Sequence, residues 1–250
     1  MSVISWNCRG LGNPRTVQFL KDLVIQKKPN FIFLCETLCR KEVVERIRVA
    51  IGFDGLFAVD AIGRSGGVAL LWRNNGDINL LHFAHNYIDV EVTSFDQGVW
   101  QLTGFYGEPN RNARVTTWDQ LKTLATASSL PWCVIGDLNN ILSHEDKRGG
   151  VPYPNWLIEG FHKTIQECEL SDLELVGHQF TWEKSRGSDA WIESRLDRAL
   201  VSKQWLVYFS SAQLLNLELS SSEHSPLLLN LVGQSHLSRH KQFRFENFWL

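Results

Sequence analysis

The chain has 250 residues, of which 44% are apolar and 21% are charged, and its formal net charge is −2. This composition excludes a disordered chain and suits one globular unit with a sizeable core. No apolar run reaches the roughly 18 residues of a membrane helix, and a first strand expected from Ser2 leaves no room for a signal peptide. The five cysteines are odd in number and scattered, so we expect reduced thiols, which are typical of an intracellular protein.

The first predicted elements are a strand and a helix. An apolar strand at 3–6 leads into a turn, after which Asn13 and Pro14 form a typical helix start. Apolar residues then recur at helical spacing until Pro29, which ends the helix.

A second strand and helix follow. The strand at 31–34 ends at Glu36, and a helix is predicted at about 40–51, with one apolar face made of Val43, Ile47 and Ile51. From about 56 to 106 the pattern becomes strand after strand. The segments expected here are 68–72, 79–83, 88–92 and 102–106.

The remainder mixes helices and strands. Helices are predicted at about 113–127 and 156–168. Strands are predicted at 132–135, 179–183, 195–201 and 226–232. Many antiparallel-type strands with a few interspersed helices favour an α/β fold in which two packed sheets are flanked by helices.

Several polar residues stand at the ends of apolar strands, where side chains can meet on a rigid sheet edge. They are Asn7, Glu36, Tyr106, Asp137, Asn139, Asp197 and His224. Each alone has an ordinary structural explanation, such as a turn cap, a solvated carboxylate or a surface ion pair. The hypothesis of a site depends on their joint occurrence.

These residues lie in six short motifs that resemble, in order, the motif blocks of the endonuclease/exonuclease/phosphatase superfamily. The motifs are Ser5-Trp6-Asn7-Cys8-Arg9-Gly10, Leu34-Cys35-Glu36-Thr37, Gly104-Phe105-Tyr106-Gly107, Ile135-Gly136-Asp137-Leu138-Asn139, Arg195-Leu196-Asp197-Arg198 and Glu223-His224-Ser225-Pro226. The start of the chain, the segment 141–150 and Phe180-Thr181-Trp182 resemble more specifically the endonuclease domain of plant LINE-type retrotransposons.

The resemblance implies a four-layer α-β-β-α sandwich, with two mixed β-sheets flanked by helices as in DNase I. The domain would cover 1–232, and the tail 233–250 looks like the junction toward a reverse transcriptase. The implied activity is nicking of one strand of duplex DNA with Mg²⁺ or Mn²⁺, without a membrane partner. A nuclear location would follow from the DNA target alone.

The resemblance also implies roles for the site residues. Glu36, Glu223 and the amide oxygen of Asn7 would bind the metal ion, whose hard character suits oxygen ligands. Asp137 would orient or deprotonate the attacking water, and Asn139 would stabilise charge developing on the phosphorus.

The remaining catalytic roles concern the phosphate. His224 would bind or protonate it while Asp197 orients the imidazole, and Tyr106 would contact it through its hydroxyl. The general base stays open between Asp137 and His224.

Two residues depart from the usual family pattern. Arg9 stands where the abasic-site repair branch carries an aspartate ligand. Glu223 stands where aspartate usually precedes the histidine, and a carboxylate displaced by about 1 Å can cost on the order of 100-fold in rate. We therefore expect a reduced but measurable activity.

The residues expected to contact the substrate are Arg9, Arg64, Thr181, Trp182 and Arg195. The segment 186–188 would form the tip of a surface hairpin that enters the DNA minor groove. For the loop at Arg64 and for the loop 147–150, a solvated turn is an equally good interpretation.

Three alternatives remain open from the sequence. One is a phosphoesterase of the same superfamily acting on a small phosphorylated substrate. Another is a catalytically weakened or dead relic that at most binds nucleic acid. The third is a module that a partner recruits through aromatic residues such as Phe245, Phe248 and Trp249.

Overall fold

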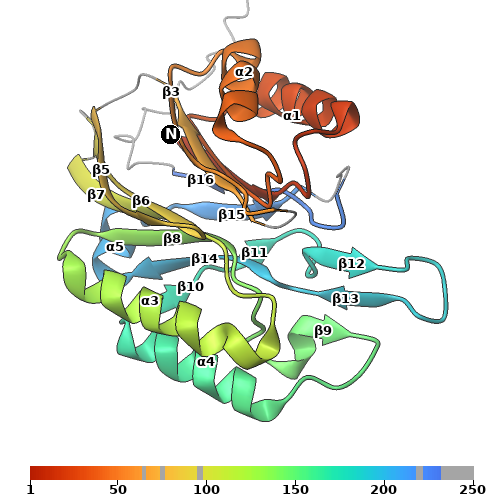
Figure 1. Cartoon of the computed structure of the whole chain (residues 1–250). Helices are drawn as coiled ribbons and strands as arrows, with labels where there is room; N and C mark the ends of the chain where they lie inside the picture. Colours follow the sequence, from red (N-terminus) through yellow and green to blue (C-terminus); the bar gives the residue numbers. More distant parts are fainter. Residues whose placement is uncertain (64–65, 74–76, 95–97, 218–221, 232–250) are drawn as a thin grey trace, which may run out of the picture.

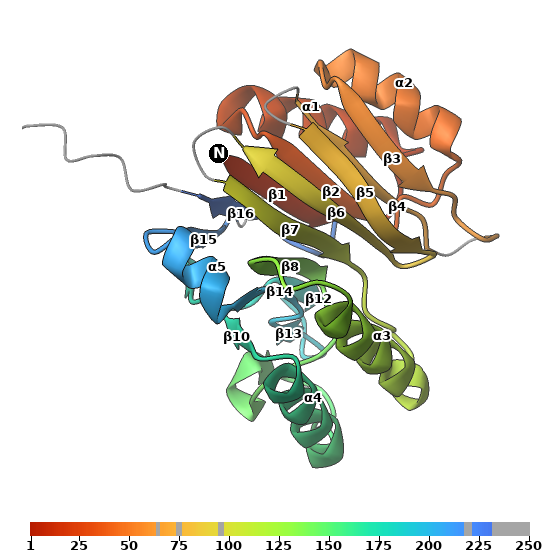
Figure 2. The same ribbon diagram turned by 90° about the vertical axis from the view of Figure 1, so that its left-hand side faces the viewer.

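A computed structural model of the chain describes residues 1–63, 66–73, 77–94, 98–217 and 222–231. Two large sheets pack face to face, and helices cover both outer faces (Figure 1, Figure 2). The predicted four-layer α-β-β-α sandwich is therefore confirmed. The predicted tail at 233–250 lies outside the described residues.

The first sheet has seven strands, and helices α1 (Pro14–Lys27) and α2 (Lys41–Ile51) cover its outer face (Figure 1). Its strand order is β11 (Leu175–Val176), β15 (Gln213–Asn216), β16 (Leu227–Asn230), β1 (Ser2–Asn7), β2 (Phe31–Cys35), β4 (Val68–Trp72) and β3 (Gly55–Val59). The central pair β1 and β2 is parallel, and β16 and β4 flank it in antiparallel orientation.

The second sheet has six strands, with α3 (Arg114–Ala127) and α4 (Asn155–Glu167) on its outer face (Figure 2). Its strand order is β10 (Leu170–Asp172), β14 (Asp197–Ser202), β8 (Trp132–Asp137), β7 (Gly98–Phe105), β6 (Tyr87–Ser94) and β5 (Asp77–Ala84). A short helix, α5 (Lys203–Tyr208), follows β14, and Trp205 of this helix is buried in the core between the sheets.

The continuous apolar runs of the central strands reflect burial on both faces. In β2, Phe31 and Phe33 face the core between the sheets, whereas Ile32 and Leu34 face the helices α1 and α2. Successive side chains of a strand point to opposite faces, so a strand covered on both sides needs apolar residues at every position.

The predicted helix boundaries are close to the observed ones. The side chain of Asn13 accepts a hydrogen bond from the backbone N–H of Arg15 and caps α1, and Pro14 is the first residue of the helix. In α2 the predicted face of Val43, Ile47 and Ile51 packs against the core, with Val43 partly buried, and Val44 joins it as a further buried residue.

A third, small sheet supports a hairpin beside the strand ends. Its strands are β12 (Trp182–Lys184), β13 (Ile192–Ser194) and β9 (Lys147–Arg148). The predicted hairpin tip at 186–188 lies in the turn between β12 and β13, which protrudes from the body of the molecule (Figure 1).

The five cysteines are free, as expected, and four of them are buried. Burial raises the pKa of Cys8 to about 12 and that of Cys168 to about 11, so these thiols stay protonated. Among the described residues, no helix is long and apolar enough to cross a membrane.

Candidate active site

The polar residues at the strand ends come together at one edge of the two sheets. Asn7 is the last residue of β1, and Glu36 follows the neighbouring parallel strand β2. In the second sheet, Asp137 ends β8 and lies directly opposite Asp197, the first residue of β14. Tyr106 follows β7, the strand beside β8.

Asn7 joins the two sheets. Its buried amide nitrogen donates to Oε1 of Glu36 and to Oδ2 of Asp137, each at 2.9 Å. Its amide oxygen accepts from the backbone N–H of Arg9 at 3.3 Å. With two carboxylates around the amide nitrogen, the oxygen points away from Glu36, so this orientation does not supply the metal ligand predicted at Asn7.

Tyr106 and Glu36 also contact each other directly. The hydroxyl of Tyr106 donates to Oε1 of Glu36 at 2.7 Å. Burial, followed by the negative charges of Asp137 and Glu36, raises the pKa of Tyr106 well above its usual value. The phenol therefore acts as a hydrogen-bond donor in the site.

The loop after β8 orients Asp137. Oδ1 of Asp137 accepts from the backbone N–H of Asn139, 2.9 Å away, and the Asn139 side chain donates to the carbonyl of Gly107. Asn139 has a left-handed backbone with φ +52°, a conformation that asparagine tolerates better than most residues. The Asn139 side chain thus ties the loop after β8 to the loop after β7.

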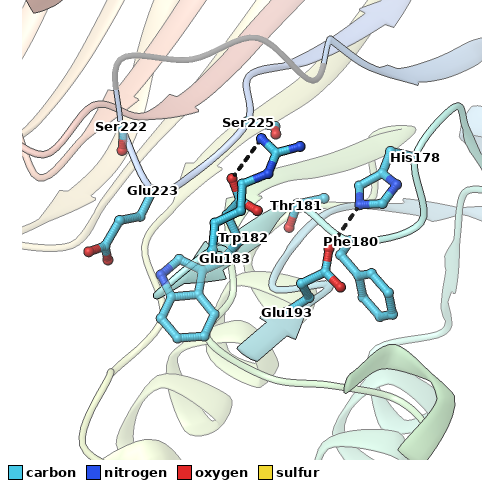
Figure 3. Close-up of a pocket in the computed structure, with 10 residues that line it drawn as sticks. His178, Phe180, Thr181, Trp182, Glu183, Glu193, Ser222, Glu223 and Ser225 are labelled. Atoms are coloured by element: carbon cyan, nitrogen blue, oxygen red, sulfur yellow. Dashed lines mark hydrogen bonds and ion pairs between the residues drawn. The ribbon is translucent and has the colours of Figure 1, made fainter. Parts of the chain in front are cut away.

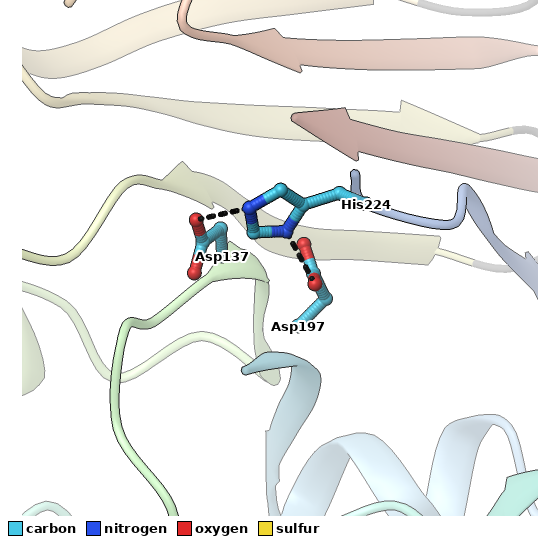
Figure 4. A group of neighbouring side chains, drawn as sticks. All are labelled: Asp137, Asp197 and His224. Atoms are coloured by element: carbon cyan, nitrogen blue, oxygen red, sulfur yellow. Dashed lines mark hydrogen bonds and ion pairs between the residues drawn. The ribbon is translucent and has the colours of Figure 1, made fainter. Parts of the chain in front are cut away.

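His224 lies between two buried carboxylates (Figure 4). Its Nδ1 is 2.9 Å from Oδ2 of Asp197, and its Nε2 is 3.7 Å from Oδ2 of Asp137. The hydroxyl of Thr181 donates to the same Oδ2 of Asp197 at 2.7 Å. The predicted pairing of Asp197 with His224 is therefore present in the structure.

Burial and neighbouring charges shift the pKa values of His224 and Asp137. Burial alone would lower the pKa of His224, but the carboxylates of Asp197 and Asp137 outweigh it and raise that pKa to about 9. Burial raises the pKa of Asp137 to about 6, although the imidazole of His224 acts in the opposite direction. At neutral pH the pair is therefore an imidazolium beside a carboxylate.

Two arrangements could hold a cation. Asp137, Asp197 and His224 offer ligand atoms that all lie within 4.8 Å of one another. A protonated imidazole has no lone pair for a metal, so this group suits proton transfer better than metal binding. The second arrangement is the pair of carboxylates of Glu36 and Glu223 on either side of Arg9.

Arg9 contacts both predicted metal ligands. Its Nη1 forms an ion pair with Oε2 of Glu223, and its Nε lies 3.7 Å from Oε2 of Glu36. Two carboxylate oxygens that converge on one cation are hard donors of the kind that Mg²⁺ or Mn²⁺ binds. The donor set at Glu36 and Glu223 therefore fits a divalent ion.

The predicted substrate residues lie in different places. Thr181 is buried and hydrogen-bonded to Asp197, and Arg195 is tied to Asp172 and to the carbonyl of Leu173, so both side chains have structural partners. Trp182 lies beside His224, with ring centroids 6.5 Å apart. Arg64 lies outside the described residues.

Residues of the β12–β13 hairpin and Glu223, the neighbour of His224, line a polar cleft (Figure 3). Trp182 and Glu223 line it on the side of His224. Glu193, which also lines the cleft, is paired with His178 and Arg148. Arg148 also lies over the rings of Phe180 and Trp191, and its side chain is 62% exposed, so a solvated turn and a phosphate contact both stay open for the loop 147–150.

One supporting group was not predicted. Arg198, beside Asp197, is buried and forms ion pairs with Asp146 and Asp172. Asp146 also accepts from the backbone N–H groups of Leu142 and Ser143, so the cluster anchors the loop after β8 to β14. An arginine inside an apolar strand is a signal that such partners exist, since a buried charge requires them.

Comparison with known proteins gives one family and several similar folds. The sequence profile of the Endonuclease/Exonuclease/phosphatase family matches residues 4–224. No curated protein sequence matches the chain significantly.

Among solved structures, the endonuclease domain of TRAS1, a telomere-specific non-LTR retrotransposon, is similar with a TM-score of 0.71 and 17% identity. The match covers 94% of this chain and 99% of that chain. An AP endonuclease from Archaeoglobus fulgidus has a TM-score of 0.72 and 14% identity, covering 94% and 100%. The 3'-5' exonuclease (NExo) from Neisseria meningitidis has a TM-score of 0.68 and 15% identity, covering 92% and 99%. Likeness at these identities establishes the shared fold.

Proposed function

The chain belongs to the endonuclease/exonuclease/phosphatase family and has its DNase I-like fold, and on that premise we propose that it is a metal-dependent DNA endonuclease that nicks one strand of a duplex. The observation that supports this most directly is the buried group of Asp137, Asp197 and His224. An imidazole between two carboxylates provides both an acid and a base for hydrolysis of a phosphodiester. The hairpin that protrudes beside the site supports a polymeric substrate (Figure 1).

His224 is the proposed phosphate-binding cation. Its Nδ1 donates to Asp197, which fixes the ring and leaves Nε2 facing Asp137 and the site. An imidazolium held in this way neutralises a non-bridging oxygen and stabilises the charge that develops as water attacks. This role makes His224 a poor general base at neutral pH.

Asp137 is the proposed general base. Its Oδ1 is held by the N–H of Asn139 and its Oδ2 by the amide of Asn7, so the carboxylate has one orientation. It accepts a proton from water as the water oxygen bonds to phosphorus and the bond from phosphorus to the leaving oxygen breaks. The leaving alkoxide then takes up a proton from a water molecule, and Asp137 returns its proton to the solvent.

A divalent ion at Glu36 and Glu223 would supply positive charge to a non-bridging oxygen and to the leaving alkoxide. Tyr106 donates to Oε1 of Glu36 and thereby holds this oxygen in place, so Oε2, which faces Arg9, is the oxygen that would bind the metal. Glu223 has a longer side chain than the usual aspartate, and we expect a lower rate for this reason.

The proposal includes an origin from a LINE-type retrotransposon. Support comes from the plant LINE-like motifs and from the similarity of the fold to the endonuclease domain of TRAS1. A nuclear location belongs to the proposal as well, because it depends only on the DNA target.

The test is nicking of supercoiled plasmid with Mg²⁺, with Mn²⁺ and with EDTA. We expect metal-dependent conversion to open circles that is lost in His224→Ala and Asp137→Ala. His82→Ala is a matched control, because His82 also pairs with a buried aspartate, Asp89, but lies on β5. Absence of nicking by folded wild-type protein with either metal would instead favour the relic, and hydrolysis of small phosphate esters would then be assayed.

A further inference from the structure

Arg9 occupies the space in which the proposed metal ion would have to bind. Its guanidinium contacts one oxygen of Glu36 and one oxygen of Glu223. The other oxygen of Glu36 is already engaged by Asn7 and Tyr106. A divalent ion that binds both carboxylates therefore needs Oε2 of Glu36, the oxygen that now faces Arg9.

The backbone of Arg9 is fixed by a hydrogen bond, whereas its side chain is partly exposed to solvent. The backbone is left-handed, with φ +46°, and its N–H donates to the side chain of Asn7. The side chains of Arg9 and Glu223 are 46% and 42% exposed. Ion pairs this exposed contribute little to stability because water screens the charges, so the guanidinium can leave without a large change in stability.

We propose that Arg9 is an exchangeable counter-ion that links DNA binding to metal binding. Without DNA, it pairs with Glu36 and Glu223 and competes with the metal ion. A phosphate of the bound duplex offers the guanidinium a bidentate partner, which draws it away from the carboxylates and opens them to the metal. DNA and metal ion then bind cooperatively, and each must raise the affinity for the other by the same factor.

This inference depends on the proposed metal site at Glu36 and Glu223, and its test does not require turnover. The Mn²⁺ affinity of the full chain without DNA is measured by electron paramagnetic resonance for the wild type and for Arg9→Ala. We expect Arg9→Ala to bind Mn²⁺ on the order of 10-fold more tightly, within the range usual for coupled sites. Arg48→Ala removes an arginine paired with Glu45 on α2 and should leave Mn²⁺ affinity unchanged.

The second measurement adds a short duplex. It is made in a His224→Ala background, so that the strand stays intact. We expect the duplex to tighten Mn²⁺ binding when Arg9 is present, and to have a several-fold smaller effect in Arg9→Ala.

The outcomes separate the two proposals. Equal or weaker Mn²⁺ binding by Arg9→Ala, with clear binding by the wild type, would overturn the role of Arg9 and leave the endonuclease proposal standing. Equal effects of the duplex with and without Arg9 would also overturn it. If neither the wild type nor Arg9→Ala binds Mn²⁺, the proposed metal site at Glu36 and Glu223 is wrong, and the role of Arg9 falls with it.

Discussion

Nδ1 of His224 lies 2.9 Å from Oδ2 of Asp197, in a buried contact between the segment before β16 and the first residue of β14. The hydroxyl of Thr181 donates to the same carboxylate oxygen. The Thr181 hydroxyl and the His224 imidazole both contact Oδ2 of Asp197, and these two contacts hold the carboxylate in place. The carboxylate in turn fixes the orientation of the His224 ring. Asp197 is therefore a positioning residue that acts through His224.

This geometry predicts the effect of Asp197→Asn. The amide keeps the shape but removes the charge that holds the proton on His224, so we expect the nicking rate to fall by about 100-fold or more. The measurement is the single-turnover rate between pH 6 and 9, in which the variant should lose activity at lower pH than the wild type. Thr181→Val should cost less, since it removes a hydrogen bond and leaves the charge. A variant Asp197→Asn with an unchanged rate and pH profile would contradict the role of this pair.

The hydrogen bond from Tyr106 to Glu36 predicts weaker metal binding in Tyr106→Phe. The substitution removes one of the two hydrogen bonds that hold Oε1 of Glu36, and we expect the Mn²⁺ concentration for half-maximal nicking to rise by about 10-fold. Tyr87→Phe is the matched control, because Tyr87 is partly buried beside Phe105 on the neighbouring strand. An equal metal requirement in Tyr106→Phe and the wild type would show that the phenol does not position the carboxylate.

The raised pKa of His224 predicts a loss of stability at alkaline pH. The folded-state pKa is about 9 and the ordinary value is about 6.5, so the contribution is complete below about pH 6.5 and is lost as pH rises through 9. We expect this to lower the free energy of unfolding by on the order of 1–3 kcal/mol across that range. Urea unfolding in EDTA at pH 6.5 and pH 9 measures this change in the free energy of unfolding. In His224→Gln, the free energy of unfolding should differ less between the two pH values.

The packing of the two sheets predicts a large effect of Gly104→Ala. A Cβ at this position would lie 2.1 Å from the ring of Phe33, which extends from the opposite sheet. Relief of this clash requires the sheets or the ring to shift, and we expect a loss of about 1–3 kcal/mol in urea unfolding. Gly12→Ala is the control, since no atom lies within 4 Å of its added Cβ. Equal stability of the two variants would mean that the interface between the sheets is looser than the structure indicates.

The sequence alone was sufficient to identify the main elements and the order of the site motifs. Strands such as β2 are apolar at every position because both faces are buried, and this signal is local. The start of α1 was equally legible, since an asparagine cap followed by proline acts within one turn. These features depend only on neighbours along the chain.

Weakly patterned elements were missed. The strands β3 and β15 and the helix α5 were not predicted as separate elements. Every residue of β3 is partly buried, so its sequence shows no clear alternation of apolar and polar residues. The helix α5 has only six residues, and it depends on the packing of Trp205. Their conformation is decided by tertiary contacts, which outweigh local propensity.

The polar residue types at the strand ends could be predicted from the sequence, because strand ends and motif order are read along the chain. The orientation of these side chains depends on how the two sheets pack. The tertiary structure turned the amide nitrogen of Asn7 toward two carboxylates, placed Thr181 on Asp197 and brought Arg9 against Glu223, 214 positions away. Such contacts depend on the distance and charge of groups far apart in the chain, and local patterns carry no information about either.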